Sequence, residues 1–282
     1  MPPTRPAPAG ARPRWGLHAP TGLAREALLV AFAILLYFGI RNATVGNADV
    51  AFANADRLVT LERHLGIAWE DSLQSAIVSH DALVTAANWV YIWGHWPVIL
   101  SVATLLYLYR PRQYYLLRNA FFVSGFIGFA FFWLFPVAPP RLLDAGLVDT
   151  VTEHSNAYRA LQPPGLTNQY AAFPSLHAGW NVLVGIVLVV AVTSLALRLV
   201  AVALPVAMSL AVVATANHFV IDVAAGLVVV LIGLVVAIFV QRRETASTLG
   251  ADGASGDRGD PGRGLAAVRR RASGREPPRQ AA

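Results

Sequence analysis

Long apolar runs, separated by shorter polar segments, make up most of this chain. Six runs reach the roughly 17–25 residues that a helix needs to cross a bilayer core. They are Leu23–Ile40, Ala86–Tyr109, Asn119–Phe135, Leu176–Leu195, Leu199–Ala216 and Phe219–Val240. The pattern predicts an all-α, polytopic membrane protein, a bundle of six transmembrane helices with a kink at Pro97 in the second. The first run lacks a cleavage pattern, so we interpret it as an uncleaved span.

The polar segments define the predicted domain organisation. Residues 1–22 are rich in Pro, Ala and Arg, and residues 241–282 in Gly, Arg, Pro and Asp, so both are predicted to be disordered. They flank a membrane domain at 23–240. Residues 42–80 place apolar side chains at helical spacing beside charged ones, which predicts amphipathic helices on the membrane surface. The connection from 136 to 173 is long enough to indicate a functional or a disordered loop.

Composition excludes several classes of function. Only 13% of the residues are charged, against about 25% in soluble domains, which supports membrane insertion. The absence of cysteine excludes disulfides, thiolate catalysis and cysteine-ligated metals. The net charge of +6 arises at the two termini, so it does not indicate nucleic-acid binding.

Charge bias predicts the topology. Six spans put both termini on one side, and the connection between the second and third spans carries Arg110, Arg112 and Arg118 without an acid. The positive-inside rule then makes the termini cytoplasmic in a plasma-membrane protein. Residues 136–177 and the turn at 216–218 fall on the extracytoplasmic face, which is where we expect the active site.

Two short polar clusters stand at the edges of apolar runs on that face. One is Phe-Pro-Ser-Leu-His, ending at His177, and the other is Asn-His-Phe-Val-Ile-Asp, from Asn217 to Asp222. Ionisable side chains at a membrane edge are costly, so they are functional candidates by default.

These residue types suit phosphoryl transfer. Asp222 follows His218 by four residues, so on a helix its carboxylate can accept the Nδ1–H of His218 and leave Nε2 as a nucleophile. His177 is a second imidazole, able to protonate a leaving group and later deprotonate an acceptor. Ser175 begins the fourth span, where free backbone N–H groups attract an anion. Arg141, on the same face, suits a phosphate.

The two clusters resemble the motifs of the type 2 phosphatidic acid phosphatase superfamily, over about residues 80–240. The Pro-Ser-Leu-His sequence and the His, aromatic, two residues, Asp pattern resemble more narrowly the branch of inositol-phosphorylceramide synthases and sphingomyelin synthases. The resemblance implies a six-span fold with an outer-face active site. It also implies that His218 is the nucleophile, Asp222 its orienter and His177 the general acid and base. No cofactor is expected, and the implied partner is a lipid phosphate within the bilayer.

Two departures separate the chain from the phosphatases of that superfamily. Leu134 stands seven residues before Arg141, where their pattern has a lysine, and Val212 stands six before His218, where it has an arginine. Both agree with the synthase-like branch. Arg118 is the competitor of Arg141 for the phosphate-binding role, but the predicted topology puts it on the cytoplasmic face.

Three further residues and three alternative functions remain open, the first function being a simple phosphatase of lipid phosphates or polyprenyl phosphates. Asn217, His95 and Tyr91 are candidates for a second tier around the site, although a structural hydrogen bond to a neighbouring helix is the favoured interpretation of His95. Two histidines and a carboxylate also permit a metal-dependent hydrolase, which Arg141 disfavours. A transporter is the other alternative, without an inverted repeat to support it. Whether the acceptor is water or an alcohol, and the oligomeric state, are not predicted.

Overall fold

The computed structural model describes residues 20–44, 47–143, 146–154 and 168–256, and within these ranges the chain is helical without a β-strand. It divides into two compact units, Met1–Ala237 and Ile238–Ala282. The predicted disorder of residues 1–22 and 241–282 falls mostly outside the described ranges. The all-α class is confirmed.

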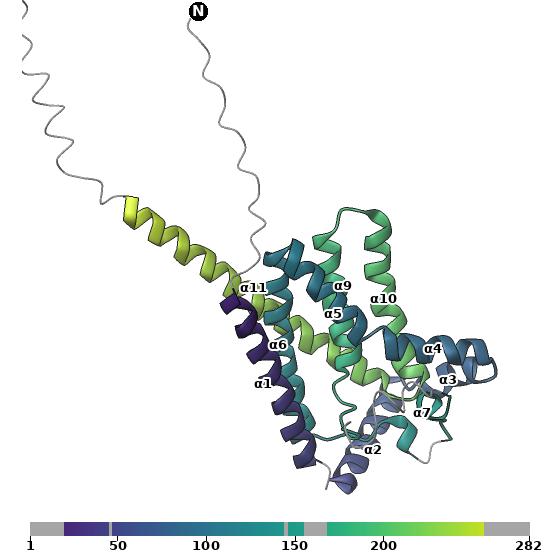
Figure 1. Ribbon diagram of the computed structural model, residues 1–282. Coiled ribbons are helices and arrows are strands. Elements are labelled where there is room, and N and C mark those ends of the chain that lie inside the picture. Colours follow the sequence, from purple (N-terminus) through teal and green to yellow (C-terminus); the bar gives the residue numbers. More distant parts are fainter. Residues whose placement is uncertain (1–19, 45–46, 144–145, 155–167, 257–282) are drawn as a thin grey trace, which may run out of the picture. The chain divides into compact units, whose positions relative to one another are not determined.

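Ten α-helices are described, and Figure 1 shows their arrangement. They are α1 (Pro20–Thr44), α2 (Ala48–Leu65), α3 (Glu70–Val78), α4 (Asp81–Trp93), α5 (Trp96–Tyr109), α6 (Pro111–Leu134), α7 (Thr150–His154), α9 (Leu176–Ala191), α10 (Leu195–Ala214) and α11 (Val220–Gly256), with a 3₁₀ turn η1 (Pro140–Leu142). The connection at 136–173 therefore contains η1 and α7.

Four helices are long and apolar enough to cross a membrane, at Gly22–Ala43, Pro111–Leu134, Leu195–Ala214 and Val220–Glu244. A fifth span arises if α4 and α5, bent by 43° at their junction, count as one. The remaining predicted span, α9, has only 16 residues. A membrane protein is therefore supported, whereas the count of six spans is not.

Several helix boundaries differ from the predicted ones. α6 begins at Pro111 rather than at Asn119, because proline is favoured in the first turn of a helix. α11 continues to Gly256, beyond the predicted end of the last span at Val240. Gln, Arg, Glu and Ala follow Val240, and all are good helix formers. The predicted kink at Pro97 is a break just before it, with Pro97 in the first turn of α5.

The predicted amphipathic segment forms α2 and α3, which lie with α7 at one end of the longer helices (Figure 1). α2 buries Ala51, Ala55 and Leu58 on one face, against a cluster that includes Val137, Ala172 and Phe219. Gly66, at a φ of 70° that favours glycine, ends the helix. Ala172 adjoins one of the polar clusters singled out in the sequence, and Phe219 belongs to the other.

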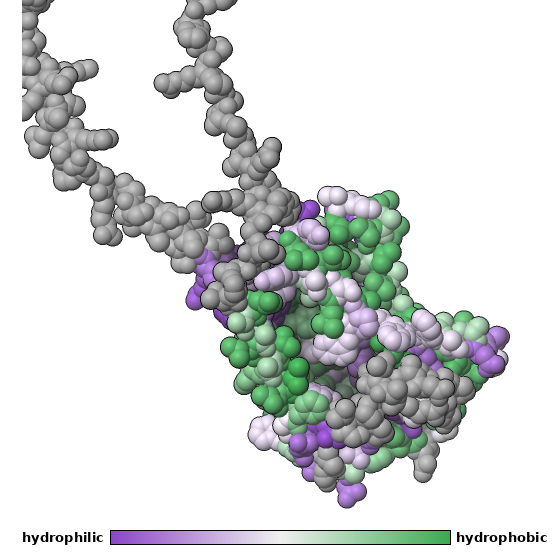
Figure 2. All heavy atoms as spheres, in the orientation of Figure 1, coloured by the Kyte–Doolittle hydropathy of each residue, from purple (hydrophilic) through white to green (hydrophobic). Residues whose placement is uncertain are grey.

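The core is built around α9, whose residues are mostly buried and which contacts α5, α6 and α10. Large apolar side chains on the outside of α1, α5 and α10 are exposed instead. Figure 2 shows such residues gathered over α1 and over α10. Exposed apolar surface of this kind suits a lipid environment.

α9 and α11 approach each other closely through glycine. A Cβ atom added to Gly226 would lie 2.2 Å from the carbonyl oxygen of Ser175, and one added to Gly179 would lie 2.7 Å from the carbonyl oxygen of Gly226. The backbones meet where the Ser175 amide donates to the Asp222 carbonyl at 2.9 Å. This contact fixes the start of α9 against the start of α11.

The first testable prediction concerns this contact. Gly226→Ala should destabilise the protein by about 1–3 kcal/mol, because the new methyl group meets backbone that cannot move alone. The loss should appear as a lower melting temperature of the purified protein in lipid nanodiscs. Gly39→Ala, on the open face of α1 where nothing lies within 4 Å, is the matched control and should not lower it. A melting temperature of Gly226→Ala equal to that of the control would contradict the close approach.

Candidate active site

Three segments that are distant in sequence meet at the ends of α9, α10 and α11. The first leads into α9 and contains Ser175 and His177, the second is the turn between α10 and α11 with Asn217 and His218, and the third is η1 with Arg141. The Arg141 amide donates to the Ala216 carbonyl at 2.9 Å. The structure therefore brings together the residues that the charge bias placed on one face.

A tight turn presents His218. Ala216 adopts a φ of 54°, a left-handed conformation that is uncommon for a residue with a Cβ atom. The amides of Asn217 and His218 both donate to the Val212 carbonyl at 3.0 Å, which closes the last turn of α10 in the manner of a Schellman motif. Strained backbone held by its surroundings is typical of functional sites.

The two imidazoles lie close together. The ring centroids of His177 and His218 lie 5.9 Å apart, with their planes tilted by 49°. Hydrogen bonds of about 2.7–3.2 Å on either side allow both rings to contact one phosphoryl group at this separation. His218 is 5% exposed, so a group bound there is largely shielded from water.

The Nδ1 of His218 has two acceptors, and the nearer one is not the predicted one. Nδ1 lies 2.8 Å from the Ala172 carbonyl oxygen and 3.5 Å from Asp222 Oδ2. A carbonyl can only accept, so Nδ1 carries the hydrogen and Nε2 is left bare. Burial lowers the pKa of His218 to about 3; the hydrogen bond to Ala172 opposes this shift, and Arg141 adds to it. The imidazole is therefore neutral at physiological pH, as a nucleophile requires.

Asp222 Oδ2 lies closer to the backbone at the start of α11 than to the His218 ring. His218 precedes α11 rather than lying in it, so the predicted one-turn helical spacing does not apply. Asp222 Oδ2 accepts the Phe219 amide at 2.9 Å, which caps α11. The Ala172 carbonyl is the closer partner of Nδ1, and Asp222 lies just beyond it; Asp222 as an orienter of His218 stays a prediction.

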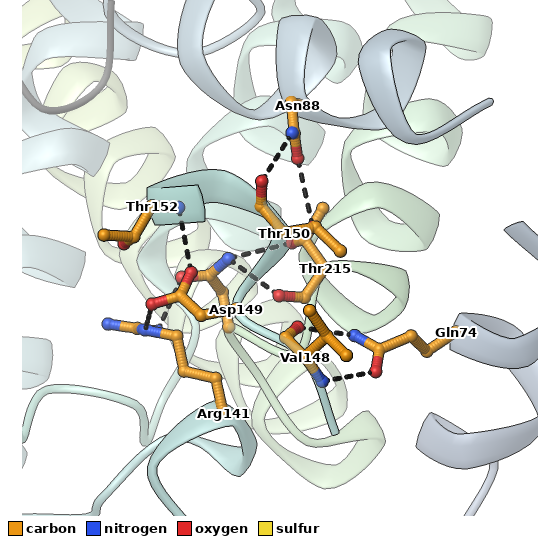
Figure 3. A network of polar contacts seen from close by, with 9 residues as sticks. Gln74, Asn88, Arg141, Val148, Asp149, Thr150, Thr152 and Thr215 are labelled. Atoms are coloured by element: carbon orange, nitrogen blue, oxygen red, sulfur yellow. Dashed lines mark hydrogen bonds and ion pairs between the residues drawn. The ribbon is translucent and has the colours of Figure 1, made fainter. Parts of the chain in front are cut away.

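Arg141 is held in place by two side chains. One guanidinium N–H donates to Asn217 Oδ1 at 2.6 Å, and Nε pairs with Asp149 Oδ2 at 3.2 Å (Figure 3). Asp149 also accepts the Thr152 amide, at the start of α7. The Arg141 side chain is 14% exposed, and its charge acts on both His177 and His218. Asn217, one of the second-tier candidates, therefore contacts the predicted phosphate-binding residue.

Ser175 acts as a helix cap. Its Oγ accepts the Ala178 amide at 3.3 Å, and the residue is fully buried. A direct contact between the hydroxyl and a phosphate gains no support from this geometry.

His95 and Tyr91 both lie against His177. The centroid of His177 lies 4.1 Å from that of His95 and 4.8 Å from that of Tyr91, in stacked arrangements. Asn181 Nδ2 contacts His95 Nδ1 at 3.2 Å, which confirms the predicted hydrogen bond to a neighbouring helix. Sequence reasoning missed Asn181, although it follows His177 by four residues on α9 and also donates to the His177 carbonyl.

Arg118 does not join this site. Its guanidinium pairs with Glu26 and so links α6 to α1. Of the two positions where the phosphatase pattern has a cation, Val212 is fully buried in the core and Leu134 is 74% exposed on the outside of α6. Among the described residues that were singled out as phosphate binders, Arg141 is the cation beside the imidazoles.

Comparison with known proteins gives one match. A family model described as PAP2 superfamily matches residues 56–236, which includes every residue of the candidate site. No curated protein and no solved structure matches the chain significantly.

Proposed function

The chain belongs to the PAP2 superfamily, and from this premise we propose that it is an integral membrane phosphotransferase or phosphatase. Its substrate is a lipid phosphate ester, and the reaction passes through a phosphohistidine at His218. Membership itself indicates phosphatase or phosphotransferase activity on phosphate esters. The lipid, the intermediate and the residue roles are the proposed part.

One observation carries this proposal. Two imidazoles 5.9 Å apart and a guanidinium converge from three segments that lie up to 77 positions apart in the chain (218 minus 141). Structural histidines do not need a fixed guanidinium beside them, whereas phosphoryl transfer needs a nucleophile, an acid and a cation around one phosphorus atom.

The first step forms the phosphoenzyme. The bound phosphate is an anion, which favours a proton on the neighbouring His177 imidazole. Nε2 of His218 attacks phosphorus as the bond from phosphorus to the departing alcohol oxygen breaks, and His177 gives that oxygen the proton it has taken up. Arg141 stabilises the negative charge on the phosphoryl oxygens. The Ala172 carbonyl, which holds Nδ1–H, supports the positive charge that develops on the ring.

The second step releases the phosphoryl group. His177, now neutral, takes a proton from water or an alcohol as that oxygen attacks phosphorus and the bond to Nε2 breaks. His218 returns to its neutral form and His177 to its protonated form. Water as the acceptor makes the protein a phosphatase, and an alcohol makes it a transferase; Leu134 and Val212 favour the synthase-like, transferring branch.

The proposal includes a topology. α4 and α5 act as one broken span, and α9 is a short span inside the bundle, which completes six spans with α1, α6, α10 and α11. Both termini are cytoplasmic, and the site opens on the extracytoplasmic face of the plasma membrane. The arginines at 110, 112, 198, 242 and 243 support this orientation.

The proposed intermediate can be tested by detecting ³²P that becomes covalently bound to the protein. The purified protein in nanodiscs, given a ³²P-labelled lipid phosphate, should acquire a label that is stable in alkali and labile in acid, as a phosphohistidine is. Added EDTA should leave labelling and turnover unchanged, because the described residues contain no group of three or more His, Asp or Glu placed to hold a metal.

Two results would contradict this proposal. Activity that disappears with EDTA and returns with zinc would favour the metal-dependent hydrolase. Movement of the lipid phosphate across liposomes without any chemical change would favour the transporter.

A further inference from the structure

The inward faces of α2 and α3 carry four buried polar side chains that the proposed mechanism does not use. Asn54 and Glu62 lie eight residues apart on α2, and Glu70 and Gln74 lie four apart on α3; we name these four the α2–α3 polar face. Their exposed fractions are between 1% and 7%. Buried carboxylates are costly unless other groups satisfy them, and neither glutamate forms an ion pair within the described ranges.

The two glutamates bind the start of α11. Glu70 Oε1 accepts the Val220 amide at 2.8 Å, and Glu62 Oε1 accepts the Ile221 amide at 2.7 Å. With Asp222 on the Phe219 amide, three carboxylates from three helices satisfy three successive N–H groups. A helix start offers such unpartnered donors and a partial positive charge. The residue immediately before these three amides is His218.

The two amide side chains bind the other segments of the site. Asn54 Nδ2 donates to the Pro136 carbonyl at 2.9 Å, five residues before Arg141. Gln74 makes a paired contact with Val148, donating to its carbonyl at 2.9 Å and accepting its amide at 2.8 Å (Figure 3). Val148 adjoins Asp149, the partner of Arg141. Each member of the polar face therefore contacts a segment that carries or orients a proposed catalytic group.

We propose that the α2–α3 polar face is a positioning element of the active site, and that Glu62 and Glu70 are positioning residues which hold His218 in register with His177. This inference rests on the proposed function for its catalytic meaning. The hydrogen bonds themselves do not depend on it. α2 and α3 are amphipathic. Their inner faces hold the segment that carries His218, and their outer faces are exposed.

Glu62 is buried near two other carboxylates, Glu70 and Asp222, which disfavours its charged form. Burial raises the pKa of Glu62 to about 8; the Ile221 amide opposes the shift, and Glu70 and Asp222 add to it. A raised pKa means that folding is favoured most below pH 4.5, the ordinary value. This contribution is lost as the pH rises through about 8, where the buried Glu62 becomes charged.

Hydrogen exchange measures the positioning without any assay of activity. In the full-length protein in nanodiscs, Glu62→Leu and Glu70→Leu should each speed exchange of the amides at 219–221 at least tenfold, because an acceptor is lost. Glu62→Gln retains an acceptor oxygen and should exchange like the wild type. Asp71→Leu, an exposed acid of α3, is the matched control and should leave this peptide unchanged.

Turnover then tests the link to catalysis. The two leucine variants should lower kcat at least tenfold with little change in KM. Glu62→Gln should instead keep kcat near the wild-type value. The wild-type kcat should fall above pH 8, and that of Glu62→Gln should not fall there. This pH comparison needs only the conservative variant, so it decides the matter even if a leucine variant does not fold.

The outcomes separate the two proposals. Faster exchange at 219–221 in a protein that turns over no lipid phosphate, even as wild type, would overturn the proposed function and leave the positioning intact. Normal exchange and normal kcat in the leucine variants, or identical pH profiles of wild type and Glu62→Gln, would overturn the positioning role.

Discussion

Replacing His218 with alanine should lower kcat/KM by about 10⁴-fold or more, since removal of a covalent nucleophile leaves only binding and charge stabilisation. His218 is neutral, shielded and oriented through Nδ1, so no neighbouring group can take its place. The loss should appear both in steady-state turnover of a lipid phosphate and in the absence of ³²P-labelled protein. His64→Ala, at an exposed histidine of α2, is the matched control and should behave like the wild type.

His177→Ala distinguishes the roles of the two imidazoles. Loss of a general acid and base costs about 10²–10⁴-fold, but a substrate with an aryl leaving group does not need the proton. That substrate should still phosphorylate His218 in the His177→Ala variant. The label should then accumulate, because deprotonation of the acceptor is slow. Equal loss of labelling with both substrates would show that His177 is not the acid.

The convergence of the site could be predicted because it follows from topology and charge. The arginines at 110, 112 and 118 predict that one face is cytoplasmic, and the number of apolar runs between them and His177 or His218 predicts that both histidines lie on the opposite face. The structure brings those two residues and Arg141 together. This prediction depends only on whether the number of spans between the arginines and each histidine is odd or even.

The Ala172 carbonyl could not be predicted in the same way. Every residue has a carbonyl, so a backbone acceptor leaves no mark in a sequence. The i to i+4 spacing of His218 and Asp222 favoured the carboxylate. The closest partner of Nδ1 is nevertheless a backbone carbonyl, because α11 begins two residues after His218. The histidine lies in the turn, where helical spacing does not hold.

Glu62 shows a signal that was available and overlooked. Ala51, Ala55, Leu58 and Glu62 follow one another at helical intervals on the buried face of α2, so the acid continues an apolar stripe. Its neighbours Leu61 and Arg63 are exposed. Two adjacent charged residues are typical of a solvated face, but here only Arg63 lies on one. Glu70 gave less warning, because an acid in the first turn of a helix is common.

The second large effect is expected at Arg141. Arg141→Ala should lower kcat/KM by about 10²–10³-fold, the usual cost of removing one donor from a site that stabilises developing negative charge. The inhibition constant of inorganic phosphate should rise as well, because the guanidinium binds the phosphoryl oxygens in the ground state too. Arg141→Lys should recover only part of the activity, since one ammonium group cannot reproduce the fork that contacts Asn217 and Asp149 while it faces a phosphate.

Arg118→Ala makes this prediction decisive, because Arg118 is the rival candidate in the sequence. Its loss removes the pairing with Glu26 between α1 and α6, so we expect a lower melting temperature with kcat/KM per folded protein unchanged. Arg141→Ala should show the opposite pattern, since Arg141 contacts the turn that carries His218 rather than another spanning helix. The reverse result, an inactive Arg118→Ala and an active Arg141→Ala, would move the phosphate to the other end of the helices. It would overturn the extracytoplasmic site together with the residue assignment, because both depend on the same count of spans.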